Sequence, residues 1–599
     1  MPVISDWREL PFEEIWAADT EFYPGVGLAN GGKEGDPSTP LCLVANEMRT
    51  GRIVKQWKGD FTPFPPYRLD SGSLFTSYLL SAEFGFHQAR GWGQPANALD
   101  AYVEYRHYVN DGTIKSGDRE KGFYSLAGAL RYFCEDEIDA AHKKDMRDRI
   151  IQGPPFTEAE RKEILHYCEQ DVRSLARLVK RLVPTIRSLP HALFRGQVMW
   201  ATACQERRGI PLAGEKYHRV KSRWDGIQVD ICLEADRPFG CYEIENGKPH
   251  WRQERFANLV RRRGIVWPQY ADGRYIVDTE TFRDMAGRYP FMEPLRELRY
   301  TMGKLKLSDL AVGNDDRNRC LLSPYGTKTG RHAPSNSKYI FGPAKWLRHF
   351  IAPPPGRALI HRDYSQQEVR IAAVLSGDAA LLHACEAGDV YLGIAEQLGF
   401  IKEGMAPSEL ESIRTMFKTV VLGIQYGLGA RSLALRTGIS VVEAAEILAR
   451  LRARFRAFEA FAQRAIDRAG LDLEIGTPFD WRMQCPSGIN PRTVRNFPIQ
   501  STGSEILHVL VVLAERRGLK IIAPVHDAVM VEADVADADD ASVALDRAMR
   551  DASAVLLKGY ELPTDQQIVR PGEHFTDKRG AQMWGTVSRL VDRLESKLA

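Results

Sequence analysis

The pattern of apolar positions changes from strand-like to helical within one short stretch of the chain. Residues 358–360 are an apolar run that ends close to Asp363, and residues 369–375 then carry apolar side chains at helical spacing. This pattern predicts a strand that brings one carboxylate to its end and passes directly into a helix. Because a strand end lies at the edge of a packed core and can still be reached by a ligand, Asp363 is placed for chemistry.

A second apolar stretch, residues 519–532, is interrupted by a polar pair. Two β-prone runs flank His526 and Asp527, which predicts a hairpin with this pair at its turn. If Asp363 and Asp527 converge, they repel one another unless cations lie between them. Two magnesium ions about 4 Å apart are the usual arrangement for attack on a phosphate. The pair therefore indicates phosphoryl or nucleotidyl transfer.

Three ordered motifs resemble those of the family A DNA polymerases, the DNA polymerase I family. DYSQQE at 363–368 is similar to motif A, RTMFKTVVLGIQYG at 414–427 to motif B with its R-x3-K-x7-YG spacing, and VHD at 525–527 to motif C. The resemblance implies a multidomain α/β protein whose polymerase domain has the right-hand arrangement of palm, fingers and thumb.

Composition limits where the protein works and what it binds. The 599 residues suggest about three or four domains. The net charge is only +3, so local clusters must hold any polyanion. The nine cysteines form no C-x-x-C pair, which favours a reducing compartment. No signal-peptide pattern and no apolar run near 18 residues is present, so we expect a soluble, cytoplasmic monomer without a membrane partner, in a bacterial or phage-infected cell.

An N-terminal strand and a later helix carry a second group of acids. Asp19 and Glu21 lie two apart in the apolar stretch 15–22, so they project from one face of the strand. Two acids on one face of an apolar strand are unfavourable unless their negative charge is offset, and a divalent metal would do so. The alternative is an exposed edge strand whose acids are solvated. A capping box at Thr157 opens a helix on which Tyr167 and Asp171 are spaced i, i+4 and share a face.

A DxE strand followed by a Y-x3-D helix resembles the DEDDy class of 3′-5′ exonucleases, and implies an RNase H-like domain. By this resemblance Asp19, Glu21 and Asp171 are metal ligands, and Tyr167 orients the attacking water. The remaining acid is assigned to Glu83, where the family has aspartate, with Asp100 as the second choice. The longer side chain puts the efficiency of proofreading in doubt.

The predicted fingers helix carries a stripe that suits a triphosphate. Its members are spaced by four: Arg414, Lys418, Leu422 and Tyr426. Each step of four residues rotates the side-chain direction around the helix axis by only about 40°, so all four lie along one stripe. A planar guanidinium fork and a compact ammonium on successive turns fit an anionic nucleotide. A solvated charged stripe is the usual alternative, but the apolar residues around Leu422 argue against it.

The resemblance also assigns roles to single residues. Glu368 crowds the 2′ position of the sugar and so favours deoxynucleotides, whereas Leu422 departs from the usual aromatic residue and leaves sugar discrimination open. Lys418 gives acid assistance to the leaving group. The implied sets are metal ligands Asp363, Tyr364 and Asp527; nucleotide contacts Gln366, Glu368, Arg414, Lys418, Leu422, Tyr426 and His526; and DNA contacts Arg331, Arg348, Arg492, Asn496 and Gln500.

The motifs divide the chain into an exonuclease domain and a polymerase half. The predicted boundaries are 1–192 for the exonuclease, 193–310 for the thumb and the approach to the palm, 311–375 for the palm with motif A, 376–485 for the fingers, and 486–599 for the palm with motif C and the C-terminal segment.

The sequence thus predicts a template-directed DNA polymerase with 3′-5′ proofreading that acts in DNA replication. Each site is expected to use two Mg²⁺ ions, with Mn²⁺ as a substitute. The expected partners are primer-template DNA, dNTPs, and a helicase, primase or single-strand-binding protein. Two alternatives stay open: a single-subunit RNA polymerase, and an exonuclease whose C-terminal half only binds DNA. A compact polymerase of this kind suits a phage.

Overall fold

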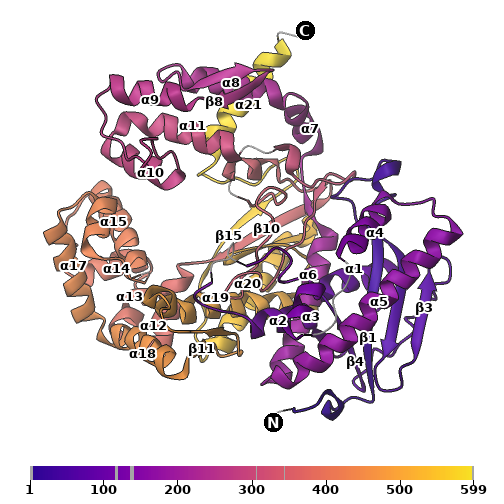
Figure 1. Cartoon of the computed structure of the whole chain (residues 1–599). Coiled ribbons are helices and arrows are strands. Elements are labelled where there is room, and N and C mark those ends of the chain that lie inside the picture. The colour runs from indigo at the N-terminus through magenta and orange to yellow at the C-terminus, as the bar shows by residue number, and fades with distance from the viewer. Residues whose placement is uncertain are drawn as a thin grey trace. The chain divides into compact units, whose positions relative to one another are not determined.

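The computed structural model describes residues 4–114, 119–134, 140–304, 307–342, 344–425 and 427–596. The chain forms two compact units, each built from several segments (Figure 1). The first unit comprises Met1–Arg208, Leu321–Ala333 and Leu359–Ile568, and the second comprises Gly209–Cys320, Pro334–Ala358 and Val569–Ala599.

The N-terminal part of the first unit contains a five-stranded sheet in the order β3-β2-β1-β4-β5. The central strand β1 (Glu14–Pro24) pairs antiparallel with β2 and parallel with β4. The remaining elements are β2 (Ser38–Glu47), β3 (Ile53–Trp57), β4 (Ser73–Ser77), β5 (Ala98–Asp100), α1 (Leu80–Arg90), α2 (Ala101–Tyr108), α3 (Leu126–Tyr132), α4 (Ala140–Gln152), α5 (Glu158–Leu182) and α6 (Leu189–Arg208).

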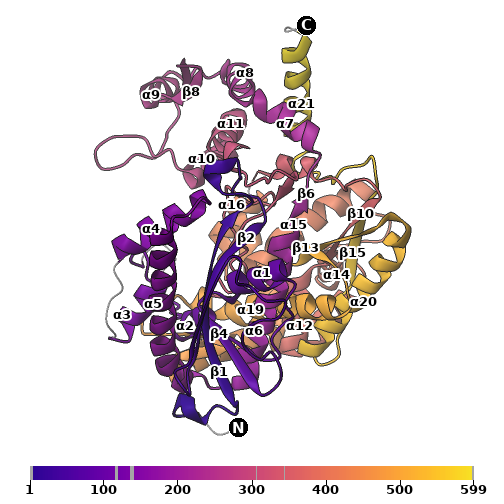
Figure 2. The ribbon, with the colours of Figure 1, turned by 90° about the vertical axis from the view of Figure 1, so that its right-hand side faces the viewer.

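Alternation along β1 decides which way its acids point. Ile15 and Ala17 belong to the apolar cluster that includes the buried face of α5. Trp16 and Ala18 belong to a different cluster, with side chains of α1 and α6. α5 packs alongside β1 (Figure 2). Asp19 continues the first set at the period of two, so it lies on the face of β1 that packs against α5. The predicted strand is confirmed, and α5 opens with the predicted capping box at Thr157.

The palm sheet has the order β13-β14-β10-β15. β10 (Arg357–Tyr364) carries Asp363 next to its last residue and is followed by α12 (Gln367–Ser376). The predicted strand-to-helix passage is therefore confirmed. The predicted hairpin is confirmed as well: β13 (Ile521–Val525) pairs antiparallel with β14 (Ala528–Asp534), and the turn residue His526 has φ +60°.

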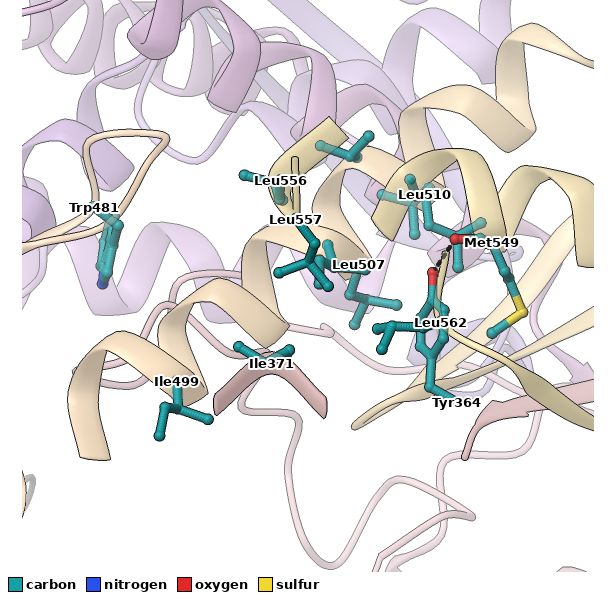
Figure 3. Close-up of a cluster of buried hydrophobic side chains, with 14 of the residues drawn as sticks. Tyr364, Ile371, Trp481, Ile499, Leu507, Leu510, Met549, Leu556, Leu557 and Leu562 are labelled. Atoms are coloured by element: carbon teal, nitrogen blue, oxygen red, sulfur yellow. Dashed lines mark hydrogen bonds between the residues drawn. The ribbon is translucent and has the colours of Figure 1, made fainter. Parts of the chain in front are cut away.

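A buried apolar layer fixes β10 from behind. Below the sheet lie α19 (Pro491–Arg516) and α20 (Ala538–Leu556), which pack against each other. The Tyr364 hydroxyl donates a 2.6 Å hydrogen bond to the backbone carbonyl of Met549 in this layer (Figure 3). α19 is long and apolar enough to cross a membrane by composition alone, but 83% of its most apolar window is buried inside the protein, as in a core helix.

The rest of the first unit is mainly helical. Between the two palm segments lie α13 (Ala379–Glu386), α14 (Val390–Gln397), α15 (Pro407–Gln425), α16 (Ala430–Thr437), α17 (Val441–Arg454), α18 (Arg456–Asp472) and the small hairpin of β11 (Glu474–Gly476) and β12 (Arg482–Gln484). β15 (Thr564–Val569) closes the palm sheet.

The second unit contains most of the predicted thumb and also takes in the end of the chain. Residues 193–208, which the sequence assigns to the thumb, belong to α6 in the first unit. Its elements are β6 (Ile210–Pro211), α7 (Gly214–Ser222), α8 (Trp224–Asp236), β7 (Tyr242–Glu245), β8 (Lys248–Trp251), α9 (Gln253–Arg262), α10 (Thr279–Arg288), α11 (Glu293–Lys304), β9 (Arg317–Asn318) and α21 (Ala581–Ser596). The segment predicted as the end of the palm divides at Val569. Within the second unit, Arg593 on α21 forms an ion pair with Asp230 on α8 at 2.9 Å.

A buried ion pair joins α2 to α6 within the first unit. Arg195 Nε and Nη2 donate to the two carboxylate oxygens of Glu104 at 2.7 and 2.8 Å, and both side chains are under 5% exposed. The two groups compensate each other only as a pair, since either charge alone would be desolvated without a partner.

We predict that Glu104→Ala destabilises the protein by about 3 kcal/mol, because it leaves Arg195 buried and unpaired. Urea unfolding followed by circular dichroism measures the change. The matched control is Glu474→Ala, which removes the more exposed bidentate pair with Arg187 and should change stability by less than about 1 kcal/mol. Equal effects of the two substitutions would contradict the assignment of a buried structural pair.

Candidate active sites

The two predicted polymerase aspartates meet at the edge of the palm sheet. The Tyr364 backbone N–H donates to the backbone carbonyl of Asp527 at 3.1 Å, which ties the end of β10 to the hairpin turn. Burial raises the pKa of Asp527, while its own backbone N–H, the charges of His526 and Arg331 and a hydrogen bond with Asp363 lower it. The two carboxyl groups are therefore in direct contact, as the sequence predicts.

A cavity of about 280 Å³ opens beside this pair. It collects most of the predicted nucleotide contacts of the palm on one surface, together with the apolar Leu422 of the fingers helix. Three of its residues, Gln367, Val369 and Tyr391, have no site role in the sequence prediction. The lining consists of Arg331, Gln366, Gln367, Glu368, Val369, Tyr391, Leu422, His526 and Asp527.

An ion pair crosses this cavity between two residues that the sequence assigns to different partners. Arg331, predicted to contact DNA, holds a Glu368 carboxylate oxygen at 2.8 Å through Nη2. Glu368 is predicted to contact the sugar of the nucleotide. The pair fixes the direction of the Glu368 carboxylate without a ligand, and it places the two predicted functions side by side.

The fingers helix α15 carries two of the predicted nucleotide contacts, Arg414 and Lys418. Arg414 Nε donates to Asp389 Oδ2 at 2.7 Å, and this hydrogen bond is the main cause that raises the Arg414 pKa. Lys418 is exposed one turn further along. Neither residue lines the cavity of Leu422, but the Arg414 guanidinium lies 6.0 Å from the centre of the Tyr391 ring, which does. The predicted member Tyr426 lies outside the described residues.

Three predicted DNA contacts lie on one wall of a larger cavity of about 620 Å³. Arg492, Asn496 and Gln500 reach it from the first turns of α19. The cavity is also lined by residues of the N-terminal part of the unit, including Arg106 and Tyr124. The structure therefore brings these three predicted residues to one cavity, whose N-terminal lining residues the sequence gave no sign of.

Arg348 is placed differently from its predicted role. The Arg348 side chain is only 5% exposed. Its guanidinium donates to the Asp577 carboxylate at 2.8 Å and to the Phe341 carbonyl at 3.1 Å. These bonds hold together separate segments of the second unit. The predicted contact of Arg348 with DNA or nucleotide stays a prediction, and this enclosed position favours a structural role.

The second acidic cluster forms between β1 and α5. Burial and the charge of Asp171 raise the pKa of Asp19 to about 7. Burial and the charges of Asp19 and Asp171 raise the pKa of Glu21. Burial and the charge of Asp171 also raise the pKa of Tyr167. The structure thus brings together the strand acids and the helix pair that the sequence predicts as one site.

Glu83 and Asp100 have clearly different surroundings. Burial and then the charge of Asp19 raise the pKa of Glu83, and its Oε2 has no hydrogen-bond partner among the described residues. Asp100 instead caps α2 and accepts backbone N–H groups of Leu80 at 2.8 Å and Tyr102 at 2.9 Å. The assignment of the fourth acid to Glu83 stays a prediction, which this arrangement supports.

The donor chemistry of both clusters suits hard divalent cations, which prefer carboxylate oxygens. In the acidic cluster, buried Glu83 Oε2 and Asp171 Oδ1 lack hydrogen-bond partners among the described residues. Within those same residues, however, no three His, Cys, Asp or Glu side chains already converge on one point as ligands of a single ion. Among the described residues, the Lys143 ammonium contacts the acidic cluster, 2.5 Å from Asp171 Oδ2.

Comparisons with known proteins agree with the geometry of the palm. The family model described as DNA polymerase family A matches residues 272–567. Residues 272–567 are a family A DNA polymerase domain. The matched region contains β10, the fingers helix α15 and the β13–β14 hairpin, and therefore all three predicted motifs.

Relatives of this polymerase domain include bacterial and phage proteins. The chain is 28% identical over 301 residues to DNA polymerase I of Synechocystis sp., which is 43% of this chain and 30% of that protein. It is 22% identical over 441 residues to the DNA polymerase of Mycobacterium phage D29, 71% of this chain and 68% of that protein. The chain thus spans about a third of the length of the first bacterial relative.

A solved structure extends the likeness of fold beyond the polymerase domain. The POL domain of Pol1 from M. smegmatis, in complex with DNA primer-template and dNTP, matches with a TM-score of 0.69 at 18% identity. The match covers 93% of this chain and 95% of that one. At this identity the comparison shows a shared fold.

Among the residues that the sequence missed, four make direct contacts at the predicted sites or line them. In the polymerase domain these are Asp389, which binds Arg414, and Tyr391, which lines the cavity of about 280 Å³. In the acidic cluster, Cys168 Sγ lies 3.3 Å from Asp19 Oδ2, and Lys143 binds Asp171. Asp389 can be recognised in the sequence as the N-cap of α14. Its ion pair with Arg414, 25 positions away, leaves no signal in the sequence.

We predict that Asp389→Ala in the polymerase domain raises the KM for nucleoside triphosphate about fivefold and changes kcat little. Asp389 contacts Arg414 Nε, so its loss frees the guanidinium from one fixed orientation. Steady-state primer extension measures both constants. Glu411→Ala is the control, because Glu411 is 68% exposed and stands 3.8 Å from Arg414. Tighter nucleotide binding by Asp389→Ala would show that Asp389 competes with the ligand instead.

Proposed function

We propose that the protein is a template-directed DNA polymerase that extends a primer 3′-hydroxyl with dNTPs. The observation that carries this proposal is the contact between Asp363 and Asp527, because Asp527 lines a cavity that Glu368 also lines. Two carboxylates from distant parts of a chain, held together at a sheet edge, are the donor set of a two-metal nucleotidyl transfer site.

In this mechanism the residues of the palm bind and orient the reactants. Asp363, Asp527 and the backbone of Tyr364 would hold two Mg²⁺ ions. When bound, Mg²⁺ lowers the pKa of the primer hydroxyl and neutralises charge on the phosphates. His526, beside Asp527 in the turn, supports the primer end.

The nucleotide is held by the fingers and selected at its sugar. Arg414 and Lys418 bind the triphosphate, and Lys418 donates a proton to the leaving pyrophosphate. Glu368, oriented by Arg331 at 2.8 Å, limits the space at the 2′ position and so disfavours ribonucleotides. Tyr426 faces the base in this proposal. Leu422 presents an aliphatic side chain to the same cavity.

The DNA is held through its minor groove. Arg492, Asn496 and Gln500 lie on one wall of the larger cavity, so they can meet the acceptor atoms that all correct base pairs present there. Such contacts test the shape of a pair without reading its sequence. Primer-template DNA and dNTP are named as bound components of the Pol1 domain that shares this fold.

We further propose 3′-5′ exonuclease proofreading at the acidic cluster. The strand order β3-β2-β1-β4-β5, with β1 antiparallel to β2, supports an RNase H-like domain. Asp19, Glu21, Glu83 and Asp171 would hold two metal ions. Tyr167, one turn before Asp171 on α5, would orient the attacking water.

Two alternatives make different predictions. A single-subunit RNA polymerase would share the metal aspartates, but the Glu368 carboxylate in the cavity favours dNTPs, and incorporation of NTPs and dNTPs on one primed template decides between them. An exonuclease with a non-catalytic DNA-binding half would show no primer extension at all. The proposal also includes a role in DNA replication in the cytoplasm, as a monomer, with a helicase, primase or single-strand-binding protein as partner.

We predict that the two activities separate by mutation. Asp527→Asn should reduce primer extension by roughly a thousandfold or more and leave 3′-5′ degradation intact, because it removes one ligand of the metal pair. Asp19→Ala with Glu21→Ala should do the reverse. Extension and degradation of one end-labelled primer-template measure both activities, with circular dichroism as the control for folding. Loss of both activities in either folded variant would contradict two separate sites.

A further inference from the structure

The helix α4 packs beside the acidic cluster and is firmly anchored. Its apolar side chains Met146 and Ile150 belong to the buried cluster that also contains residues of β1 and α5. Arg149 donates to Glu160 at 2.6 Å and to the Gly153 carbonyl at 2.9 Å, which fixes the end of α4 to the start of α5. The first turns of α4 are therefore held at a defined position next to the acids.

One side chain of α4 reaches into the cluster. Lys143 Nζ contacts Asp171 Oδ2 at 2.5 Å, where Asp171 is 6% and Lys143 33% exposed. The same ammonium lies 5.8 Å from the centre of the Tyr167 ring. It thus contacts both members of the helix pair to which catalysis is assigned.

The cluster needs positive charge in the absence of metal. Asp19, Glu21, Glu83 and Asp171 bring four carboxyl groups into a partly desolvated space, where like charges repel strongly. The charge of Lys143 acts on both Asp19 and Glu21 in addition to its bond with Asp171. Arg147, one helical turn further along α4, acts on Glu21 from the same helix face.

We propose that Lys143 is a built-in counter-ion of the acidic cluster, which holds the carboxylates together without metal and competes with a divalent ion for Asp171. Lys143 is thus a positioning residue. The inference rests on the proposed exonuclease function. It adds that metal binding at this site is an exchange, in which the ammonium gives up the Asp171 oxygen that the metal takes.

The test measures Mn²⁺ binding to the full chain by electron paramagnetic resonance. Asp363→Asn with Asp527→Asn forms the background, so that the polymerase aspartates do not contribute. Lys143→Met should bind Mn²⁺ roughly tenfold more tightly, because the competitor for Asp171 is gone. Lys143→Arg keeps the charge and should retain the parent affinity. Lys144→Met, an exposed neighbour on the same helix, should also leave affinity unchanged.

A second measurement uses the same variants in EDTA at pH 8. Lys143→Met should melt about 3 °C lower than the parent, because the ionised carboxylates lose their counter-ion, and saturating Mn²⁺ should restore the melting temperature. Lys143→Arg and Lys144→Met should melt with the parent. Unchanged affinity within twofold, or unchanged melting in EDTA, for Lys143→Met would overturn the proposal.

A different experimental result would show that the exonuclease proposal is wrong. If Asp19→Ala with Glu21→Ala bound as much Mn²⁺ as the parent, the cluster would not be a metal site and the proposed exonuclease function would fail. The melting of Lys143→Met in EDTA would then still decide whether Lys143 serves as counter-ion.

Discussion

The repulsion between carboxyl groups that the fold forces together is the constraint on which this structure depends. At the palm, Asp363 comes from the end of a strand and Asp527 from a hairpin turn far away in the chain, and the two touch at one end of the sheet. At the N-terminal sheet, Asp19 lies near Asp171 in a space that raises the pKa of Asp19 to about 7. Such groupings are unfavourable unless protons, basic side chains or metal ions offset the charge, and this requirement connects the fold to its proposed chemistry.

Both sites are built by the same means. A central strand presents its acids from a packed sheet, and a buried helix or hairpin brings the partner groups to the same edge. Apolar packing behind the acids supplies the rigidity: the Tyr364 hydroxyl is bonded to the α20 backbone, and Ile15 and Ala17 fix β1 against α5. The two sites differ in their nearby cations. Arg331 holds Glu368 beside the palm aspartates, whereas Lys143 bonds directly to one of the acids.

Local patterns in the sequence predicted the elements that carry the sites. The strand before Asp363, the hairpin at Asp527 and the capping box at Thr157 each depend on neighbouring residues, and each is present. Tertiary partners could not be predicted, because no local signal links Asp389 to Arg414 or Lys143 to Asp171. Arg348 could be singled out from its motif, but the motif does not reveal its ion pair with Asp577. That pair depends on a C-terminal segment more than 200 residues away.

The contact between the palm aspartates implies a shared pair of metal ions, and one measurement tests it directly. A crystal of the protein with primer-template DNA, a non-hydrolysable dNTP analogue and Mn²⁺ locates each ion by anomalous scattering. The account predicts two Mn²⁺ ions at the β10 end, both bonded to Asp363 and Asp527. Ions that contact only one of these aspartates, or that lie at separate positions, would contradict it.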